Sequence, residues 1–168
     1  KNIENLVLII GKTEGHIDQS LFSRIILDEK NGPPPEVNLF NEKNNGESLL
    51  NLIEKNYIKS AHDVSLGGIL TAVSKMCIKG NKGIELEKSK DLMNDIEYFF
   101  AEDQGRYIVE INQKDLKEVS KILDKNSVHH EKLGVIVDKD VIINEKTKVT
   151  IDELKAYNNN WLTNYMSS

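Results

Sequence analysis

Residues 60–70, SAHDVSLGGIL, bring chemically useful side chains to a predicted junction between a strand and a helix. The candidates in this motif are His62, Asp63, Ser65, Gly67 and Gly68. The first two fall where a short strand is expected to end, and Ser65 is expected to cap a helix over residues 65–80. A helix N-terminus presents unpaired N–H groups and a positive dipole end, which attract an anion such as phosphate. Asp63 opposes that anion unless Mg²⁺ bridges the two.

The two glycines leave two interpretations of this motif open. A glycine in the first turn of a helix costs roughly 1 kcal/mol relative to alanine, so Gly67 and Gly68 indicate the close approach of another group. That group is either a packed neighbouring segment or a ligand. The motif is therefore either a structural corner or a nucleotide–metal site.

A second motif, FFAEDQGRY over residues 99–107, lies on a corner that is expected to join two buried strands. Its polar candidates are Glu102, Asp103, Gln104 and Arg106. Carboxylates beside an amide suit Mg²⁺ or the recognition of a polar substrate, and Asp63 and Glu102 are the candidate metal ligands. The same residues suit an exposed turn in which Gly105 supplies a positive φ. Arg106 is expected either to form an ion pair or to hold a phosphate.

Other motifs favour structural roles. Residues 11–13, GKT, lack the G-x-x-x-x-G-K-[ST] pattern of a P-loop. His129 and His130 are adjacent and point to opposite faces of a strand, so no metal site is expected there. Cys77, the only cysteine, is expected to be a buried apolar side chain. Aromatic residues at helical spacing are expected to dock the last helix: Tyr157, Trp161 and Tyr165.

Composition excludes several classes of partner. The net charge is −5 and the isoelectric point is about 5.4, which argues against nucleic acid and anionic membrane as main partners. No apolar stretch approaches the ~20 residues that span a bilayer, so a cytoplasmic setting is expected. The chain begins with Lys1 and runs almost directly into an apolar strand, which suggests a piece of a longer polypeptide.

Hydrophobic periodicity predicts a mixed β-sheet packed with helices, an α/β or α+β fold in a single domain over residues 1–168. Strands are expected over 5–11, 58–64 and 83–87, on both sides of the acidic corner, and as a hairpin around 138–140. Helices are expected over 20–27, 47–58, 65–80 with Gly80 as its cap, 112–127, and from Thr150 or Asp152 onward. Ser20 or Asp18 can cap the first helix, and Pro33–Pro35 predict a rigid polar connector over 28–46.

The order of these motifs resembles the C-terminal domain of the aminoimidazole ribonucleotide synthetase superfamily. Within it, the chain is most similar to the last domain of the synthetase subunit of phosphoribosylformylglycinamidine synthase. The resemblance spans nearly the whole chain and rests on GKT, IDQSLF, GPPPEVNL, the Asn-Gly that precedes a Leu-Ile pair, AHDVSLGGI, FAEDQGR and LGVI. The pattern departs from the family at Asp18, where Gly is usual, and at Asn38, where Asp is usual. An acid at position 18 opposes phosphate binding by that loop.

The resemblance implies an ATP-dependent ligase of purine biosynthesis with Mg²⁺ as cofactor. It converts the amide of formylglycinamide ribonucleotide to an amidine, with ammonia from a separate glutaminase subunit and with a small accessory subunit. The chain then needs upstream ATP-binding domains of the same polypeptide and is inactive alone. The resemblance also implies that this second copy of the domain forms a largely structural nucleotide site. Its site-forming counterparts here are Ser20, His62, Asp63, Ser65, Gly67, Gly68, Glu102, Asp103, Gln104 and Arg106. The alternatives are another synthetase or kinase of the superfamily, or a non-catalytic interaction module.

Overall fold

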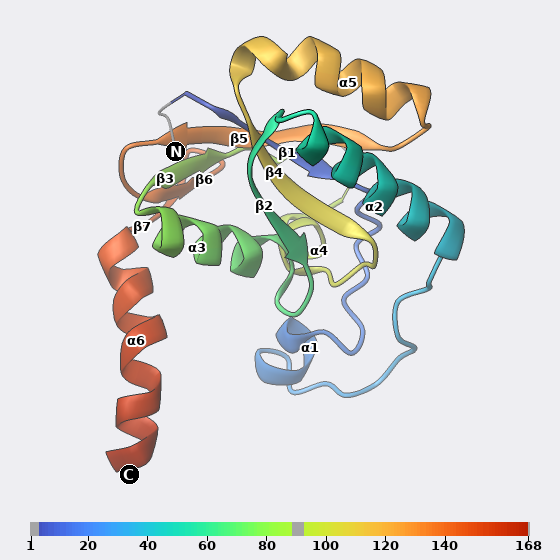
Figure 1. Ribbon diagram of the computed structural model, residues 1–168. Helices are drawn as coiled ribbons and strands as arrows, with labels where there is room; N and C mark the ends of the chain where they lie inside the picture. Colours follow the sequence, from blue (N-terminus) through green and yellow to red (C-terminus); the bar gives the residue numbers. More distant parts are fainter. Residues whose placement is uncertain (1–3, 89–92, 168) are drawn as a thin grey trace.

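A seven-stranded mixed sheet forms the centre of the computed structural model, which describes residues 4–88 and 93–167 (Figure 1). The strand order is β2-β4-β1-β5-β3-β6-β7. The strands are β1 (Leu6–Ile10), β2 (Ile58–Val64), β3 (Gly83–Leu86), β4 (Arg106–Ile111), β5 (His130–Val137), β6 (Val141–Ile143) and β7 (Thr147–Val149). The mixed-sheet fold expected from the sequence is confirmed.

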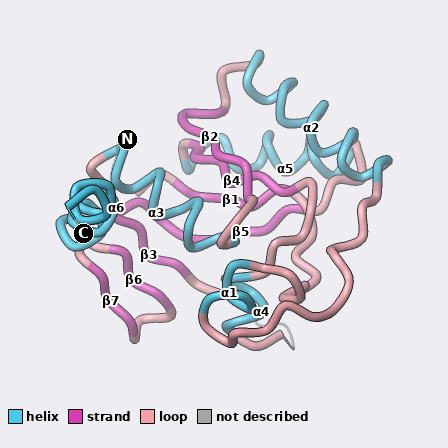
Figure 2. Tube along the Cα trace, turned by 90° about the horizontal axis from the view of Figure 1, so that it is seen from below, coloured by secondary structure: helices cyan, strands magenta, loops and turns pink. Residues whose placement is uncertain are grey.

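Helices cover both faces of this sheet (Figure 2). The helices are α1 (Leu21–Ile25), α2 (Leu39–Glu54), α3 (Gly68–Gly80), α4 (Asp95–Phe100), α5 (Leu116–Lys125) and α6 (Ile151–Ser167). A short 3₁₀ turn, Gln113–Asp115, leads into α5.

The central strand β1 is buried on both faces because its alternate side chains enter two different cores. Leu8 and Ile10 pack with residues of α2 and α5, such as Leu52 and Leu123. Val7 and Ile9 instead pack with α3 and α4. This explains the uninterrupted apolar run that predicted the strand.

The polar connector is shorter than predicted. Helix α2 begins at Leu39, eight residues before the predicted start at Glu47. Asn38 makes this possible because its side chain accepts a hydrogen bond from the amide of Asn41 at 3.0 Å, the arrangement of an N-cap. Residues 39–46 lack a clear apolar stripe, so periodicity alone missed them.

The segment before the acidic corner is helix α4 and not a strand. Asn94 and Glu97 form a capping box: each side chain accepts a hydrogen bond from the other residue's backbone N–H. Two aromatic side chains of α4, Tyr98 and Phe99, are buried. The capping box was the sequence signal for a helix. The aromatic residues that follow it favoured a strand instead, which led to the wrong prediction.

Two further predictions of local structure are wrong. Strands β5 and β6 do not form a hairpin, because β3 lies between them, antiparallel to β5 and parallel to β6. Strand β6 pairs instead with β7. At the ends of α3, Gly67 and Asn81 occupy the cap positions predicted for Ser65 and Gly80, both in left-handed conformation.

The last helix is also placed differently from the prediction. Thr150 caps it as expected, since its hydroxyl accepts from the amide of Glu153 at 3.1 Å. The predicted docking of its aromatic side chains is wrong for Tyr157 and Trp161, which are 81% and 64% exposed. Helix α6 runs away from the sheet after its first turn (Figure 1). Within the described ranges, no helix is long and apolar enough to cross a membrane.

Candidate functional site

Three loops of the predicted site meet at one end of strands β1, β2 and β4. Strand β2 pairs antiparallel with β4, with Asp63 opposite Tyr107 and Val64 opposite Arg106. Strand β1 also pairs antiparallel with β4, with Ile10 opposite Tyr107. The ends of β1 and β2 therefore lie beside the start of β4. This pairing brings together the loop after β1, the turn after β2 and the acidic corner before β4.

Glu102 joins the two main motifs directly. Its Oε1 accepts a hydrogen bond from the backbone N–H of Gly67 at 2.8 Å. The same oxygen accepts from the N–H of Leu21, the first residue of α1, also at 2.8 Å. The His-Asp turn and the acidic corner are thus in contact, and this carboxylate oxygen is used to hold two loops.

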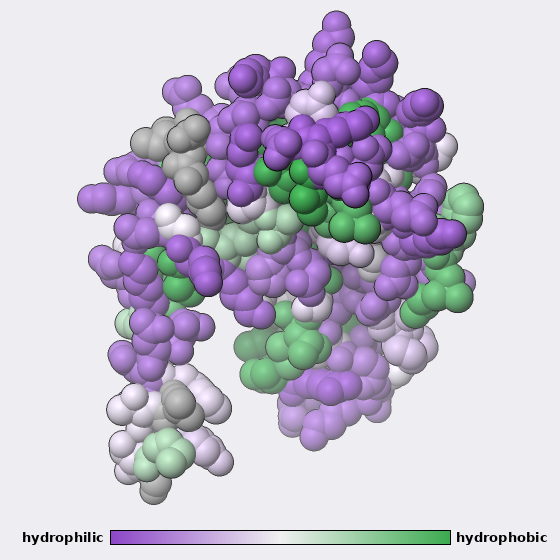
Figure 3. All heavy atoms as spheres, in the orientation of Figure 1, coloured by the Kyte–Doolittle hydropathy of each residue, from purple (hydrophilic) through white to green (hydrophobic). Residues whose placement is uncertain are grey.

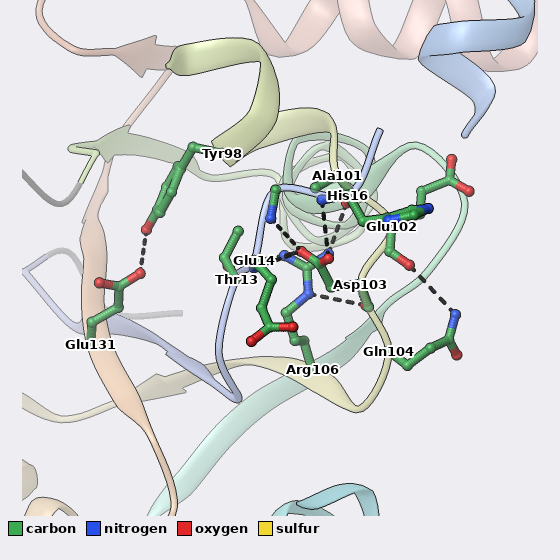
Figure 4. A network of polar contacts seen from close by, with 11 residues as sticks. Thr13, Glu14, His16, Tyr98, Ala101, Glu102, Asp103, Gln104, Arg106 and Glu131 are labelled. Atoms are coloured by element: carbon green, nitrogen blue, oxygen red, sulfur yellow. Dashed lines mark hydrogen bonds and ion pairs between the residues drawn. The ribbon is translucent and has the colours of Figure 1, made fainter. Parts of the chain in front are cut away.

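Asp103 anchors the loop after β1 (Figure 4). Its two carboxylate oxygens accept hydrogen bonds from three successive backbone N–H groups, those of Glu14, Gly15 and His16, at 3.0 to 3.1 Å. The residue is 6% exposed. A carboxylate surrounded by amides in this way stabilises a loop conformation and has little capacity left for a ligand.

Arg106 is buried beneath this corner and each of its nitrogen groups has a partner. Nε and Nη2 donate to the carbonyl oxygens of Asp103 and Ala101, and Nη1 donates to the hydroxyl of Thr13. The guanidinium also lies 3.7 Å from the carboxylate of Asp103. Burial lowers the pKa of Arg106, and the carboxylate of Asp103 opposes that shift. Of the two roles predicted for Arg106, this geometry supports the ion pair.

The surroundings of Gly68 show which group approaches the glycine pair closely. A Cβ at this position would lie 2.7 Å from the carbonyl oxygens of Phe99 and Ala101. The start of α3 therefore packs directly on the end of α4, and the close approach is made by backbone. Gly67, at φ +80°, supplies the left-handed residue that turns the chain into α3.

Five predicted site residues remain at least partly accessible: His62, Asp63, Ser65, Glu102 and Gln104. The side chain of Asp63 is 65% exposed and that of His62 is 27% exposed. His62 Nδ1 lies 2.6 Å from the backbone oxygen of Asp63. Ser20, by contrast, is 1% exposed and caps α1 by accepting from the amide of Ser23.

A polar cavity of about 590 Å³ lies beside the acidic corner. It is lined by Gly11, Lys12, Glu14, Gly15, His16, Glu36, Asn38, Asn41, Glu42, Asn45, Asp103, Gln104, Ser127 and His129. Most of these residues were not among the predicted site residues. Some lie in the first half of α2, which was expected to be connector, and others lie in the loop after β1. Asn45 had a usable signal in the Asn-Gly pair, and it donates to the carbonyl of Gly105 at 2.9 Å.

The described residues hold no group of three or more His, Cys, Asp or Glu that could hold a metal ion. Asp63 and Glu102 therefore do not form a complete protein cage. Mg²⁺ often uses only one or two carboxylates and takes its other ligands from phosphates and water. Asp63 fits that arrangement better than Glu102, whose Oε1 already accepts two hydrogen bonds.

Comparison with known protein families shows the class of protein to which the chain belongs. Residues 3–144 match the family described as AIR synthase related protein, C-terminal domain, and the chain belongs to this family. The chain is 64% identical over all 168 residues to phosphoribosylformylglycinamidine synthase subunit PurL of Pelagibacter ubique, of which it covers 23%. It is 32% identical over 161 residues to the corresponding subunit of Nitrobacter hamburgensis, of which it covers 22%. The chain thus spans less than a quarter of the length of these relatives.

Solved structures share the fold. T. maritima PurL complexed with FGAR superposes with a TM-score of 0.73 at 20% identity, over 92% of this chain and 28% of that one. T. maritima PurL complexed with ATP gives a TM-score of 0.69 at 20% identity, over 92% of this chain and 26% of that one. The resemblance inferred from the motifs is confirmed, and so is the fold.

Proposed function

We propose that residues 1–168 form one C-terminal synthetase-type domain of a longer ATP-dependent ligase. That ligase converts formylglycinamide ribonucleotide to its amidine in purine biosynthesis, and this domain is inactive alone. The observation that most directly supports this proposal is the 64% identity to a phosphoribosylformylglycinamidine synthase subunit over the whole chain. The single sheet running through the described residues supports a one-domain reading.

The proposed reaction uses ATP to activate an amide oxygen. The terminal phosphoryl group of ATP passes to the glycinamide carbonyl oxygen of the substrate, and ADP leaves. Ammonia then attacks the activated carbon and phosphate departs with the former amide oxygen, which leaves the amidine. Mg²⁺ supplies charge neutralisation to the phosphates when it is bound.

Within this domain we assign three kinds of role to the predicted site residues. Glu102, Asp103 and Arg106 hold the loops in place through the hydrogen bonds described above. Asp63 and Gln104, which are exposed, are the groups available to a nucleotide or its Mg²⁺. Ser20, Gly67 and Gly68 act through helix capping and close packing.

The partners follow from the same proposal. The remaining sequence of the longer polypeptide supplies ATP-binding domains, and a glutaminase subunit with a small accessory subunit supplies ammonia. A solved structure of the PurLQS assembly from Thermotoga maritima has the same fold at 20% identity. We place the complex in a bacterial cytoplasm, without nucleic acid or membrane as partner.

The function is tested on the full-length protein that contains this chain. Purified protein with formylglycinamide ribonucleotide, Mg·ATP and ammonium should release ADP and phosphate in equal amounts and form the amidine. Omission of the ribonucleotide should abolish ADP release. ADP release that ignores the ribonucleotide but responds to another acceptor would assign the chain to a different synthetase or kinase of the superfamily.

The site assignment is tested by calorimetry of Mg·ADP binding to the same full-length protein. Asp63→Ala should remove or weaken one binding event, because the exposed carboxylate no longer supports the metal–phosphate group. Asp152→Ala, on the exposed first turn of α6, serves as the control and should bind as wild type. Identical binding by both variants would make the His-Asp turn a structural corner only.

A further inference from the structure

Among the described residues, contacts of the C-terminal helix α6 with the rest of the fold lie at its beginning. Ile151 is buried, Leu154 packs against the core, and Lys155 donates to the side chain of Asn81 at 2.6 Å. Residues 156–161 and 163–167 are exposed. In Figure 1 this outer part of α6 extends away from the sheet and the other helices.

The outer part of α6 has an unusual composition for an exposed helix. Residues 156–167, AYNNNWLTNYMS, contain no Asp, Glu, Lys or Arg, although 29% of the whole chain is charged. Solvent-facing helix surfaces normally carry charged side chains. In Figure 3 this end of the molecule is pale, in contrast to the purple that dominates the rest of the visible surface. Such a sequence is typical of a helix that is covered by another surface.

Aromatic side chains line one side of this segment. Tyr157, Trp161 and Tyr165 are spaced by four residues, which places them on one face of the helix. The rings of Trp161 and Tyr165 stack with centroids 5.5 Å apart and an interplanar angle of 10°. The side of Trp161 that does not face Tyr165 is open to solvent, since the residue is 64% exposed. Exposed Trp and Tyr are the residues most enriched at energetic centres of interfaces.

The length of the relatives indicates what covers this face. The Pelagibacter relative aligns with all 168 residues, α6 included, yet the alignment takes in only 23% of that protein. The family model, by contrast, ends at residue 144 and stops before α6. Helix α6 therefore lies outside the part matched by the family model but is aligned in a relative that is a much longer polypeptide.

We propose that the aromatic face of α6 docks into an uncharged groove on the part of the longer polypeptide outside these 168 residues. This inference rests on the proposed function only in placing the chain within a longer protein. Because residues 156–167 carry no charge, the groove needs no opposite charge and is lined by apolar and amide groups. The asparagine side chains of residues 158–160 can form hydrogen bonds with its rim.

Amide hydrogen exchange in the full-length protein tests this docking. Backbone amides of residues 156–167 should be protected in wild type. Trp161→Glu, which places a charge in the groove, should make them exchange at least about tenfold faster. The matched control is Thr163→Glu, which adds the same charge on the opposite side of the helix and should change exchange less than about threefold. Trp161→Phe, which keeps most of the apolar ring, should retain the protection.

Three results would overturn the proposal. One is fast exchange of residues 156–167 in wild type, and another is equal effects of the two glutamate variants. The third is a halved sedimenting mass of full-length Trp161→Glu, which would make a second copy the occupant. Synthase activity is measured separately: protection without activity would leave the docking intact and refute the proposed function, and activity without protection would do the reverse.

Discussion

The carboxylates of the acidic corner act mainly as acceptors for backbone N–H groups. Glu102 accepts from Leu21 and Gly67, and Asp103 accepts from three amides of the loop after β1. Residue type alone could not distinguish this role from metal binding, because both uses need an oxygen with free lone pairs. The sequence therefore predicted which residues meet at the corner but left their roles open.

The role of Glu102 separates two substitutions. Glu102→Gln should change the free energy of unfolding by less than about 1 kcal/mol, because an amide oxygen can still accept both hydrogen bonds. Glu102→Ala leaves two amides without their acceptor and should cost about 2–3 kcal/mol. Urea unfolding of both variants measures the difference. A loss of stability in Glu102→Gln as large as in Glu102→Ala would show that the negative charge itself is required.

Removal of the Asp103 charge should destabilise the chain strongly. Asp103→Asn leaves the buried guanidinium of Arg106 without its nearest carboxylate and places an amide NH₂ group among backbone donors. Loss of one partner from a buried pair costs about 3–5 kcal/mol, and the remaining carbonyl partners of Arg106 place the expected loss near 3 kcal/mol. Urea unfolding measures it, with Asp28→Asn as control because Asp28 is exposed at a positive φ that Asn tolerates. A loss below about 1 kcal/mol for Asp103→Asn would contradict the account.

At the scale of elements, the packing of α3 on α4 decides the geometry of the site. Gly68 lies at φ +67°, and a Cβ there would lie 2.7 Å from backbone atoms of α4. Because that backbone cannot move without shifting Glu102, the two helices and the acidic corner form one unit.

Two glycine substitutions test this packing, because one should lower the free energy of unfolding and the other should raise it. Gly68→Ala should cost at least about 2 kcal/mol through backbone strain and overlap with α4. Gly46→Ala, inside α2, meets only the hydroxyl of Tyr107 at 3.6 Å and should stabilise by roughly 0.5–1 kcal/mol. Thermal or urea unfolding measures both. Equal effects of the two substitutions would refute the close approach at Gly68.

The first turn of α6 should lose stability in acid. Hydrogen bonds from Thr150 lower the pKa of Glu153 below its ordinary value. A depressed carboxyl pKa in the folded state gives stability that is present above the unfolded pKa and lost as pH falls through the folded pKa. NMR titration should therefore show a low pKa for Glu153 that returns to the ordinary value in Thr150→Ala. Thr147→Ala, on the exposed part of β7, should leave it unchanged. Titration of Glu153 at its ordinary pKa in wild type would disprove the hydrogen bonds that Thr150 donates to its carboxylate.

The fold was predicted where the local signal was strong. The buried strand β1, the helix α5 and the turn from β2 into α3 all followed from periodicity and glycine placement. The errors arose where tertiary pairing or capping decided the outcome. The insertion of β3 between β5 and β6 cannot be deduced from a hairpin-like sequence, and α4 depends on a capping box hidden beside aromatic residues.

At the scale of the whole molecule, the structure leaves large apolar surfaces uncovered. Ile25, Ile26 and Leu66 are 61–69% exposed, and they lie on α1 and on the turn held together by Glu102. In Figure 3 the region of α1 shows as green on an otherwise mostly purple surface. Together with the exposed aromatic face of α6, these exposed apolar side chains favour the interpretation that other parts of a longer polypeptide cover this domain.

Product formation by the 168-residue chain alone tests this account most directly. The chain is incubated with formylglycinamide ribonucleotide, Mg·ATP and ammonium, beside the full-length protein in the same assay, and both ADP and amidine are quantified. We predict turnover by the full-length protein and none by the chain alone. Ribonucleotide-dependent ADP and amidine formation by the chain alone would contradict the claim that its active site is completed elsewhere.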